Sequence, residues 1–115
     1  MKQLFVLPAG WRCPNPSELV GSEGLRRALE ELSGMFDVII LDSPPVLVAS
    51  EAVILSKQVD GVLVVLRAGH TERKAAQRAV HQLSVVGARV LGTVLNDPDA
   101  EEAKYGGSHE YYYHN

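Results

Sequence analysis

The sequence predicts an α/β fold in which helices flank a parallel β-sheet. Two observations support this prediction. Short apolar segments alternate along the chain with segments of helical periodicity, and three of the apolar segments run almost without a polar residue. A near-continuous apolar strand is buried on both faces, which is typical of parallel sheets covered by helices. The length of 115 residues suits a single domain.

Four segments have the composition expected of strands. Residues 4–7 form the first, and the second, residues 36–41, leads directly into Asp42. The third and fourth, residues 62–66 and 90–95, are rich in valine and leucine, which fit a pleated and buried surface. We therefore expect a sheet of about four strands.

Three main helices are expected, at residues 22–33, 51–59 and 72–86. In the first, leucines at spacings of i, i+4 and i+7 form one apolar face, and Gly34 is a suitable stop. Ser50 and Thr71 precede the other two helices and are expected to cap them. The inward face of the third helix is expected to contain Ala76, Val80 and Leu83, followed by Val86 or Gly87.

Composition excludes several classes of protein. A net charge of −3 gives no basic footprint for nucleic acid. No apolar run approaches the roughly 18 residues of a membrane span, and no signal peptide is visible at Met1. Cys13 is the only cysteine, so the chain has no intrachain disulfide and no cysteine-based metal cluster. We expect a soluble, cytoplasmic chain.

The candidate site lies where the predicted strands end. Ligands of open parallel sheets bind beyond the carboxyl ends of the strands, and Asp42, Arg67 and Asn96 fall at three such ends. Asp42 is a candidate Mg²⁺ ligand beside nucleotide phosphates, or simply a carboxylate that caps a turn. Arg67 could meet phosphate, Asp42 or solvent, and Asn96 is a ligand contact or an ordinary turn starter.

One expected part of a nucleotide site is missing from these residues. The phosphate-binding loop G-x-x-x-x-G-K-S/T does not occur in the 115 residues. The pattern predicts one half of an ATP site.

The composition changes after Asp97. All four tyrosines lie in the last 11 residues, in a segment with two glycines and no periodicity. We therefore expect a domain at residues 1–104 and a flexible tail at residues 105–115. Exposed tyrosines in such a tail point to modification, to a docking stripe or to aggregation; they are Tyr105, Tyr111, Tyr112 and Tyr113.

Four spaced blocks and the tail resemble the bacterial tyrosine kinases of capsule and exopolysaccharide synthesis, which are deviant P-loop ATPases related to the MinD/ParA group. Residues 7–19 resemble the family's L-P-A-G and P-N-P-S/T-E-L-L block, and residues 36–45 its Walker B strand. Residues 60–71 resemble its D-G-V strand, which ends in R-x-G-x-T. Residues 90–96 resemble its G-x-V-L-N strand, and the tyrosine cluster its phosphorylated tail.

The resemblance covers the C-terminal half of the family's kinase domain. It implies a partial Rossmann-like sheet of the P-loop NTPase type that lacks the P-loop strand. The Walker A loop, the Walker A′ motif and the ring-assembly helix precede this half in the family. By resemblance, Asp42 is the Walker B ligand of Mg²⁺, Asn96 lies where related ATPases contact adenine, and the phospho-acceptors are Tyr105, Tyr111, Tyr112 and Tyr113.

The resemblance implies ATP-dependent tyrosine autophosphorylation with ATP and Mg²⁺, and a chain that is inactive alone. Its implied partners are the missing N-terminal kinase half or a complete kinase, and a membrane adaptor of polysaccharide export. That adaptor would hold an oligomer at the inner face of the cell membrane. Two alternatives stay open: a non-catalytic phospho-acceptor or regulatory partner of a complete kinase, and a fragment of a MinD/ParA-type ATPase.

Overall fold

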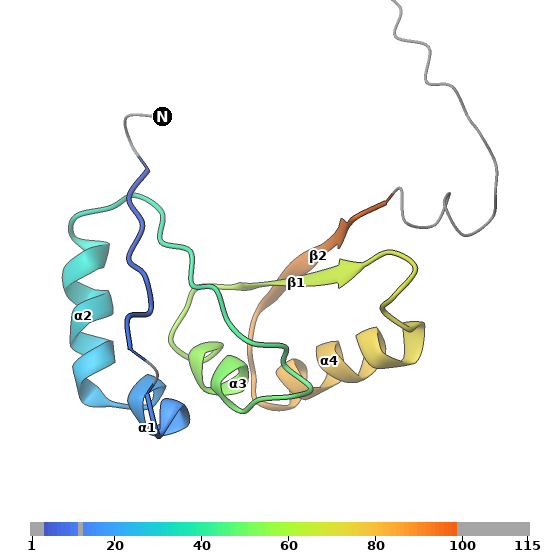
Figure 1. Ribbon diagram of the computed structural model, residues 1–115, viewed down its shortest axis with the longest axis horizontal. Coiled ribbons are helices and arrows are strands. Elements are labelled where there is room, and N and C mark those ends of the chain that lie inside the picture. The colour runs from blue at the N-terminus through green and yellow to red at the C-terminus, as the bar shows by residue number, and fades with distance from the viewer. Residues whose placement is uncertain (1–3, 12, 99–115) are drawn as a thin grey trace, which may run out of the picture. The chain divides into compact units, whose positions relative to one another are not determined.

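The computed structural model describes residues 4–11 and 13–98. The chain divides into two compact units, residues 1–41 and 42–115. The first unit contains α1 (Pro16–Val20) and α2 (Glu23–Ser33). The second contains α3 (Glu51–Leu55), β1 (Val62–Arg67), α4 (Arg73–Val85) and β2 (Val90–Asn96), all labelled in Figure 1.

The helix predicted at residues 22–33 is confirmed as α2. It begins as expected, because the hydroxyl of Ser22 accepts a hydrogen bond from the backbone N–H of Leu25 at 3.2 Å. The three leucines of its apolar face are the partly buried ones of the helix, while charged residues occupy the exposed surface. Gly34 ends the helix with a φ of −78°, so this position does not use the left-handed conformation that favours glycine.

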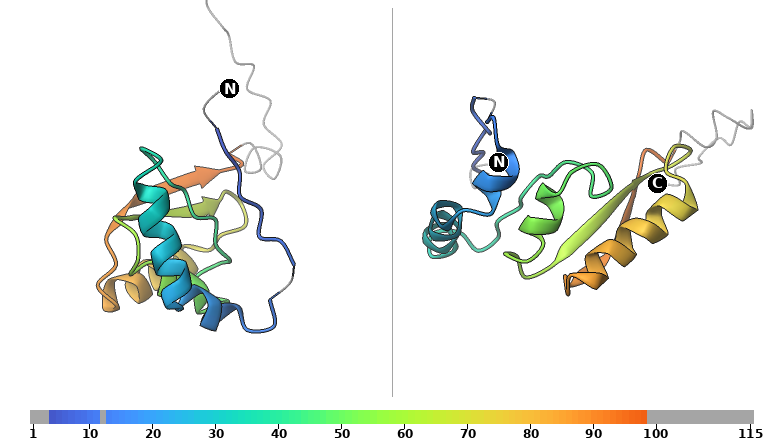
Figure 2. Two further views of the ribbon diagram at one scale, coloured as in Figure 1. Left: turned by 90° about the vertical axis from the view of Figure 1, so that its left-hand side faces the viewer. Right: turned by 90° about the horizontal axis from the view of Figure 1, so that it is seen from below.

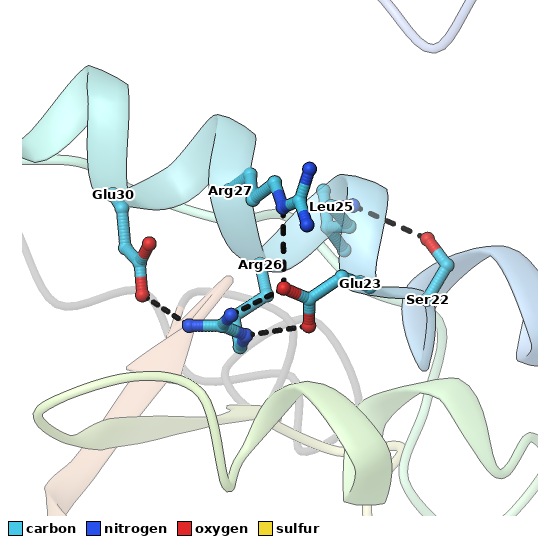
Figure 3. Close-up of polar contacts among 6 residues, drawn as sticks. All are labelled: Ser22, Glu23, Leu25, Arg26, Arg27 and Glu30. Atoms are coloured by element: carbon cyan, nitrogen blue, oxygen red, sulfur yellow. Dashed lines mark hydrogen bonds and ion pairs between the residues drawn. The ribbon is translucent and has the colours of Figure 1, made fainter.

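A network of charges stabilises the exposed surface of α2 (Figure 3). The Arg26 guanidinium donates hydrogen bonds to Glu23 and Glu30, and Arg27 Nε donates to Glu23 Oε1 at 3.2 Å. These partners lie three or four residues apart, the spacing that brings side chains together on a helix. The hydrogen bonds from Arg26 and then Arg27 lower the pKa of the Glu23 carboxyl.

The prediction of about four strands is wrong for two of them. Residues 4–7 and 36–41 are not strands, and the sheet of the described residues contains only β1 and β2. A β-strand requires a hydrogen-bonded neighbour, and neither segment has one among the described residues. Instead, the rings of Phe5 and Phe36 pack at a centroid distance of 5.3 Å, while Val6 and Ile40 are 79% and 87% exposed.

The second unit contains the predicted parallel pairing. β1 and β2 run parallel, in a register that sets Val64 opposite Thr93 and Arg67 opposite Asn96. α4 connects the two strands and runs along the sheet in Figure 1 and in the right-hand view of Figure 2. A parallel connection of this kind requires a crossover, which α4 supplies. The fold is therefore α/β with a two-stranded parallel sheet and flanking helices.

The core of the second unit is small. Leu83 of α4 is 2% exposed, and Ala52, Val64, Ala68 and Ala79 are also buried. Val64 is buried whereas its strand neighbours Leu63 and Val65 are 58% and 63% exposed, so the described residues cover β1 on one face only. The predicted inward face of α4 is confirmed at Leu83; Ala79 is buried in addition, and Ala76 and Val80 are partly buried.

Two predicted helix caps differ in the structure. Ser50 precedes α3, but its side chain makes no capping hydrogen bond, and α3 ends at Leu55 rather than near residue 59. Thr71 does not cap α4, whose N-cap residue is Glu72. The Thr71 hydroxyl instead accepts a hydrogen bond from the backbone N–H of Arg67. Threonine hydroxyls can accept hydrogen bonds from backbone N–H groups in turns as well as at helix starts. In this structure the Thr71 hydroxyl stabilises the turn after β1.

Candidate functional site

The carboxyl ends of β1 and β2 meet at one edge of the sheet. Arg67, the last residue of β1, lies opposite Asn96, the last residue of β2. The backbone N–H of Ala68 donates to the Asn96 carbonyl oxygen at 2.9 Å, which continues the ladder by one step. Asn96 is exposed. The sheet therefore brings together two of the predicted site residues, Arg67 and Asn96, at the edge where α/β proteins bind ligands.

A tight turn follows Arg67 and leads into α4. The Arg67 N–H donates to Thr71 Oγ1 at 2.9 Å, and the Thr71 N–H donates back to the Arg67 carbonyl at 2.8 Å. Gly69, within this turn, has a φ of +67°, a left-handed conformation that glycine adopts without steric cost. The turn therefore fixes the backbone on both sides of the Arg67 side chain.

An ion pair joins the two strand ends. Arg67 Nε and Nη2 both lie 3.0 Å from Asp97 Oδ2. Asp97 has a φ of +58°, which aspartate tolerates better than most residues. The sequence did not single out Asp97. Asp97 could have been identified from the parallel pairing of the two strands. That pairing sets Arg67 opposite Asn96 and therefore places Asp97, the next residue, beside Arg67.

Asp42 is not part of this cluster. It is the first residue of the second unit and is exposed, and the side-chain ion pair of Arg67 among the described residues is with Asp97, not with Asp42. The prolines that follow shape the chain, since the Pro45 carbonyl accepts hydrogen bonds from the N–H groups of Val48 and Ala49 at 2.9 and 3.1 Å. Ser43 bonds locally, with its Oγ 3.3 Å from the Pro44 carbonyl.

The described residues contain no preformed cluster of metal ligands. Within residues 4–11 and 13–98, no three His, Cys, Asp or Glu side chains gather into a metal-binding group. The Asp42 carboxylate alone fits the way Mg²⁺ is usually bound, through one or two carboxylates plus substrate phosphates. If bound, Mg²⁺ would be held by Asp42.

The predicted phospho-acceptors cannot be placed in this site. Tyr105, Tyr111, Tyr112 and Tyr113 lie outside the described residues. In the part of the chain that is described, no helix has the length and apolar character needed to cross a membrane.

Comparisons with known proteins identify related kinases. No family model matches the chain. The tyrosine-protein kinase CpsD of Streptococcus pneumoniae serotype 4 is 35% identical over 92% of this chain, and the tyrosine-protein kinase YwqD of Bacillus subtilis is 33% identical over 91%. The chain spans less than half the length of these relatives, 47% and 45% respectively.

A solved structure gives the same result for the fold. The kinase domain of VpsO superposes with a TM-score of 0.75 at 34% sequence identity, over 78% of this chain and 44% of that domain. The matched region is the C-terminal part of the related proteins. The chain is therefore a relative of the bacterial tyrosine kinases and corresponds to the C-terminal part of their kinase domain.

Proposed function

We propose that this chain is the C-terminal part of a protein-tyrosine kinase that autophosphorylates with ATP and regulates capsular or exopolysaccharide biosynthesis. The observation that supports this most strongly is the 35% identity, over 92% of the chain, to a tyrosine-protein kinase. The coverage of under half of that relative, together with the absence of a G-x-x-x-x-G-K-S/T loop from these 115 residues, supports a chain that is catalytically inactive by itself.

Each candidate residue has one role in this proposal. Asp42 holds Mg²⁺ and Asn96 contacts the adenine. Arg67 binds phosphate of the nucleotide at the same edge of the sheet. ATP and Mg²⁺ supply the phosphoryl group and the charge that neutralises it. The exposed Asp42 carboxylate and the exposed Asn96 at the carboxyl end of β2 support these roles, because both leave their polar atoms accessible to a ligand. No general base is assigned to this chain.

The tyrosines accept the phosphoryl groups in this proposal. Each phosphotyrosine adds about 1.5 to 2 negative charges, so a fully modified tail repels its neighbours. The acceptors are Tyr105, Tyr111, Tyr112 and Tyr113. This repulsion would favour dissociation of an oligomer whose tails enter neighbouring active sites.

The proposed partner is a polypeptide that carries the N-terminal kinase half, or a complete kinase. A membrane adaptor of polysaccharide export would hold the assembly at the inner face of the membrane. The apolar side chains left exposed in both units support a partner, because large uncovered apolar surfaces mark interaction sites. Val6 and Ile40 in the first unit, and Leu63 and Val65 in the second, are more than half exposed.

A second candidate function is a non-catalytic phospho-acceptor that regulates a complete kinase. The same absence of the phosphate-binding loop favours it, and the tyrosine-rich tail suits it equally. The coding sequence upstream of Met1 separates the two candidates. An open frame that encodes G-x-x-x-x-G-K-S/T in register supports the kinase, whereas a separate complete kinase gene beside it supports the regulatory partner.

Calorimetry tests the proposed half site directly. We expect no measurable heat of MgATP binding for the chain alone, because one carboxylate without a phosphate loop holds the nucleotide weakly. We expect binding when a polypeptide with the N-terminal kinase half is added, and its loss in the Asp42→Asn variant of this chain. Binding of MgATP by the chain alone, unchanged in Asp42→Asn, would contradict the proposal.

A further inference from the structure

The guanidinium of Arg67 is only partly occupied by its ion pair. Arg67 Nε donates a hydrogen bond to Asp97 Oδ2, and Nη2 lies at the same distance of 3.0 Å from that oxygen. A guanidinium carries five N–H donors, and Asp97 engages only the edge formed by Nε and Nη2. Among the described residues, Asp97 is the one partner of this side chain. The outer edge of the guanidinium, formed by Nη1 and Nη2, is therefore open to an anion.

Asp97 is held in a backbone conformation that its place in the sequence disfavours. Its φ is +58°, and in the described part of the chain it is the one residue other than glycine with a positive φ. It also precedes Pro98, and a residue before proline favours extended backbone with a negative φ. Such conformations persist where surrounding contacts hold them, and they concentrate at ligand clamps and switches. The ion pair with Arg67 is the side-chain contact that holds Asp97.

The backbone keeps the two charged groups beside each other. The Ala68 N–H donates to the Asn96 carbonyl at 2.9 Å, and the Thr71 N–H donates to the Arg67 carbonyl at 2.8 Å. These bonds fix the chain on both sides of Arg67 and directly before Asp97. A rearrangement at this site is therefore confined to the two side chains, and the Asp97 carboxylate stays within reach of the guanidinium as a tethered partner of high effective concentration.

The ion pair can be exchanged for a ligand. Both side chains are accessible to solvent, and an exposed pair of this kind contributes little to stability. An anion that binds the Nε edge must displace the Asp97 carboxylate. An anion that binds the outer edge lies close to the same carboxylate and is repelled by it. Whichever edge a ligand uses, the negative charge of Asp97 therefore lowers the affinity of Arg67 for it.

We propose that Asp97 reserves Arg67 for multiply charged phosphate ligands by competing with anions for its guanidinium. A singly charged anion has the same charge as the Asp97 carboxylate, but it must come from solution whereas Asp97 is tethered beside Arg67. A phosphate group with two or more negative charges attracts the guanidinium more strongly and can accept two of its N–H groups at once. This role of Asp97 rests on the proposed phosphate role of Arg67, and it makes Asp97 the residue that determines which anions are accepted there.

NMR titration of the full chain tests this competition. The Nε–Hε signal of Arg67, assigned by its loss in Arg67→Lys, is followed during titration with sodium pyrophosphate and, separately, with sodium acetate at the same ionic strength. Binding that is too weak for calorimetry still shifts this signal. In the wild-type chain we expect pyrophosphate to shift it and acetate to leave it in place. In Asp97→Asn the apparent affinity for pyrophosphate should rise about five-fold, the factor that corresponds to an exposed ion pair of about 1 kcal/mol, and acetate should also shift the signal.

Asp60→Asn is the matched control. Asp60 is exposed, lies before the opposite end of β1, and forms no ion pair with another described residue. The control removes the same charge as Asp97→Asn but leaves the ion pair of Arg67 intact, so both titrations should match those of the wild-type chain. The backbone amide signals of β1 and β2 should keep their positions in Asp97→Asn, which separates a gain in affinity from local unfolding of the sheet edge.

Several results would overturn the competition. One is an affinity for pyrophosphate in Asp97→Asn that is equal to or lower than that of the wild-type chain, and another is a rise of the same size in Asp60→Asn. A wild-type signal that acetate shifts as far as pyrophosphate does, or that neither anion shifts in any variant, would also overturn it. The titration needs no N-terminal kinase half, so its failure is distinct from a failure of the proposed kinase function, which is measured by phosphorylation in the presence of that half.

Discussion

Arg67 and Asp97 join the carboxyl ends of β1 and β2, with both Nε and Nη2 of the arginine 3.0 Å from a single carboxylate oxygen. The pair lies at the edge where Asn96 is exposed, directly after the end of β2. The two side chains are 60% and 41% exposed. The pair therefore contributes to local geometry more than to global stability.

Replacing either partner should have a small effect on unfolding. Exposed ion pairs contribute about 0–1 kcal/mol, so Arg67→Gln and Asp97→Asn should each lower the free energy of unfolding by less than about 1 kcal/mol. Urea unfolding at a fixed chain concentration measures this, and the double variant gives the coupling energy. A loss of more than about 2 kcal/mol in either single variant would show that the pair stabilises the fold far more than an exposed ion pair does.

Gly87 and Gly34 provide a matched pair of glycines at helix ends. Gly87 follows α4 with a φ of +76°, and the Gly87 and Ala88 N–H groups donate to Ser84 and Leu83 at 3.0 Å, the pattern of a Schellman motif. Gly87→Ala should therefore destabilise by about 1 kcal/mol. Gly34→Ala, at a φ of −78°, should be neutral or slightly stabilising. Equal urea midpoints for the two variants would contradict this assignment.

Gly61 allows the Leu91 side chain to pack over the backbone. A Cβ atom at Gly61 would lie 2.6 and 2.7 Å from the two Cδ atoms of Leu91. Gly61→Ala should cost about 1–3 kcal/mol through overpacking, and adding Leu91→Ala should recover part of that loss. Gly92→Ala is the control, since no described atom beyond its two chain neighbours lies within 4 Å of its Cβ position. If Leu91→Ala gives no recovery in urea melts, the contact does not explain the cost.

Leu83 tests the core of the second unit. It is 2% exposed, and truncation of a buried leucine to alanine typically costs 2–5 kcal/mol. We expect Leu83→Ala to reduce the urea midpoint far more than Val85→Ala, since Val85 on the same helix is 70% exposed. Similar midpoints for the two variants would show that α4 does not pack through Leu83.

The pH dependence of α2 follows from Glu23. Because Arg26 and Arg27 lower its pKa in the folded chain, Glu23 stabilises α2 above its unfolded pKa and loses this contribution as the pH falls through the lowered folded value. The difference in urea midpoint between wild type and Glu23→Gln should therefore be present at pH 7 and vanish at a pH below the folded pKa. Glu31→Gln on the same helix, where the described residues form no ion pair with Glu31, should show no such change.

The sequence predicted the parts of this structure that depend on local pattern. The leucine spacing and Ser22 located α2, and the apolar runs located β1 and β2 with their parallel pairing. The strands at residues 4–7 and 36–41 were predicted from the same kind of pattern, but strand formation depends on a neighbour. An apolar run shows only that a segment is suited to a sheet. The sequence therefore could not decide whether these two segments form strands.

The candidate site was predictable to the same extent. The strand-end rule identified Arg67 and Asn96, which the register brings opposite each other. It did not identify Asp97, because a side-chain pairing across two strands depends on the exact register and on the left-handed backbone at that residue. Thr71 was assigned to the wrong role for a related reason: its hydroxyl had two possible partners, and only the geometry of the turn decides between them.

Phosphotyrosine mapping tests the central claim most directly. The purified chain is incubated with MgATP, alone and with a polypeptide that supplies the N-terminal kinase half, and its C-terminal peptides are analysed by mass spectrometry. The proposed function predicts no phosphate on the chain alone and phosphate within Tyr105, Tyr111, Tyr112 and Tyr113 when the other half is present. Phosphorylation of the chain alone, or tyrosines that stay unmodified with an active kinase half, would contradict it.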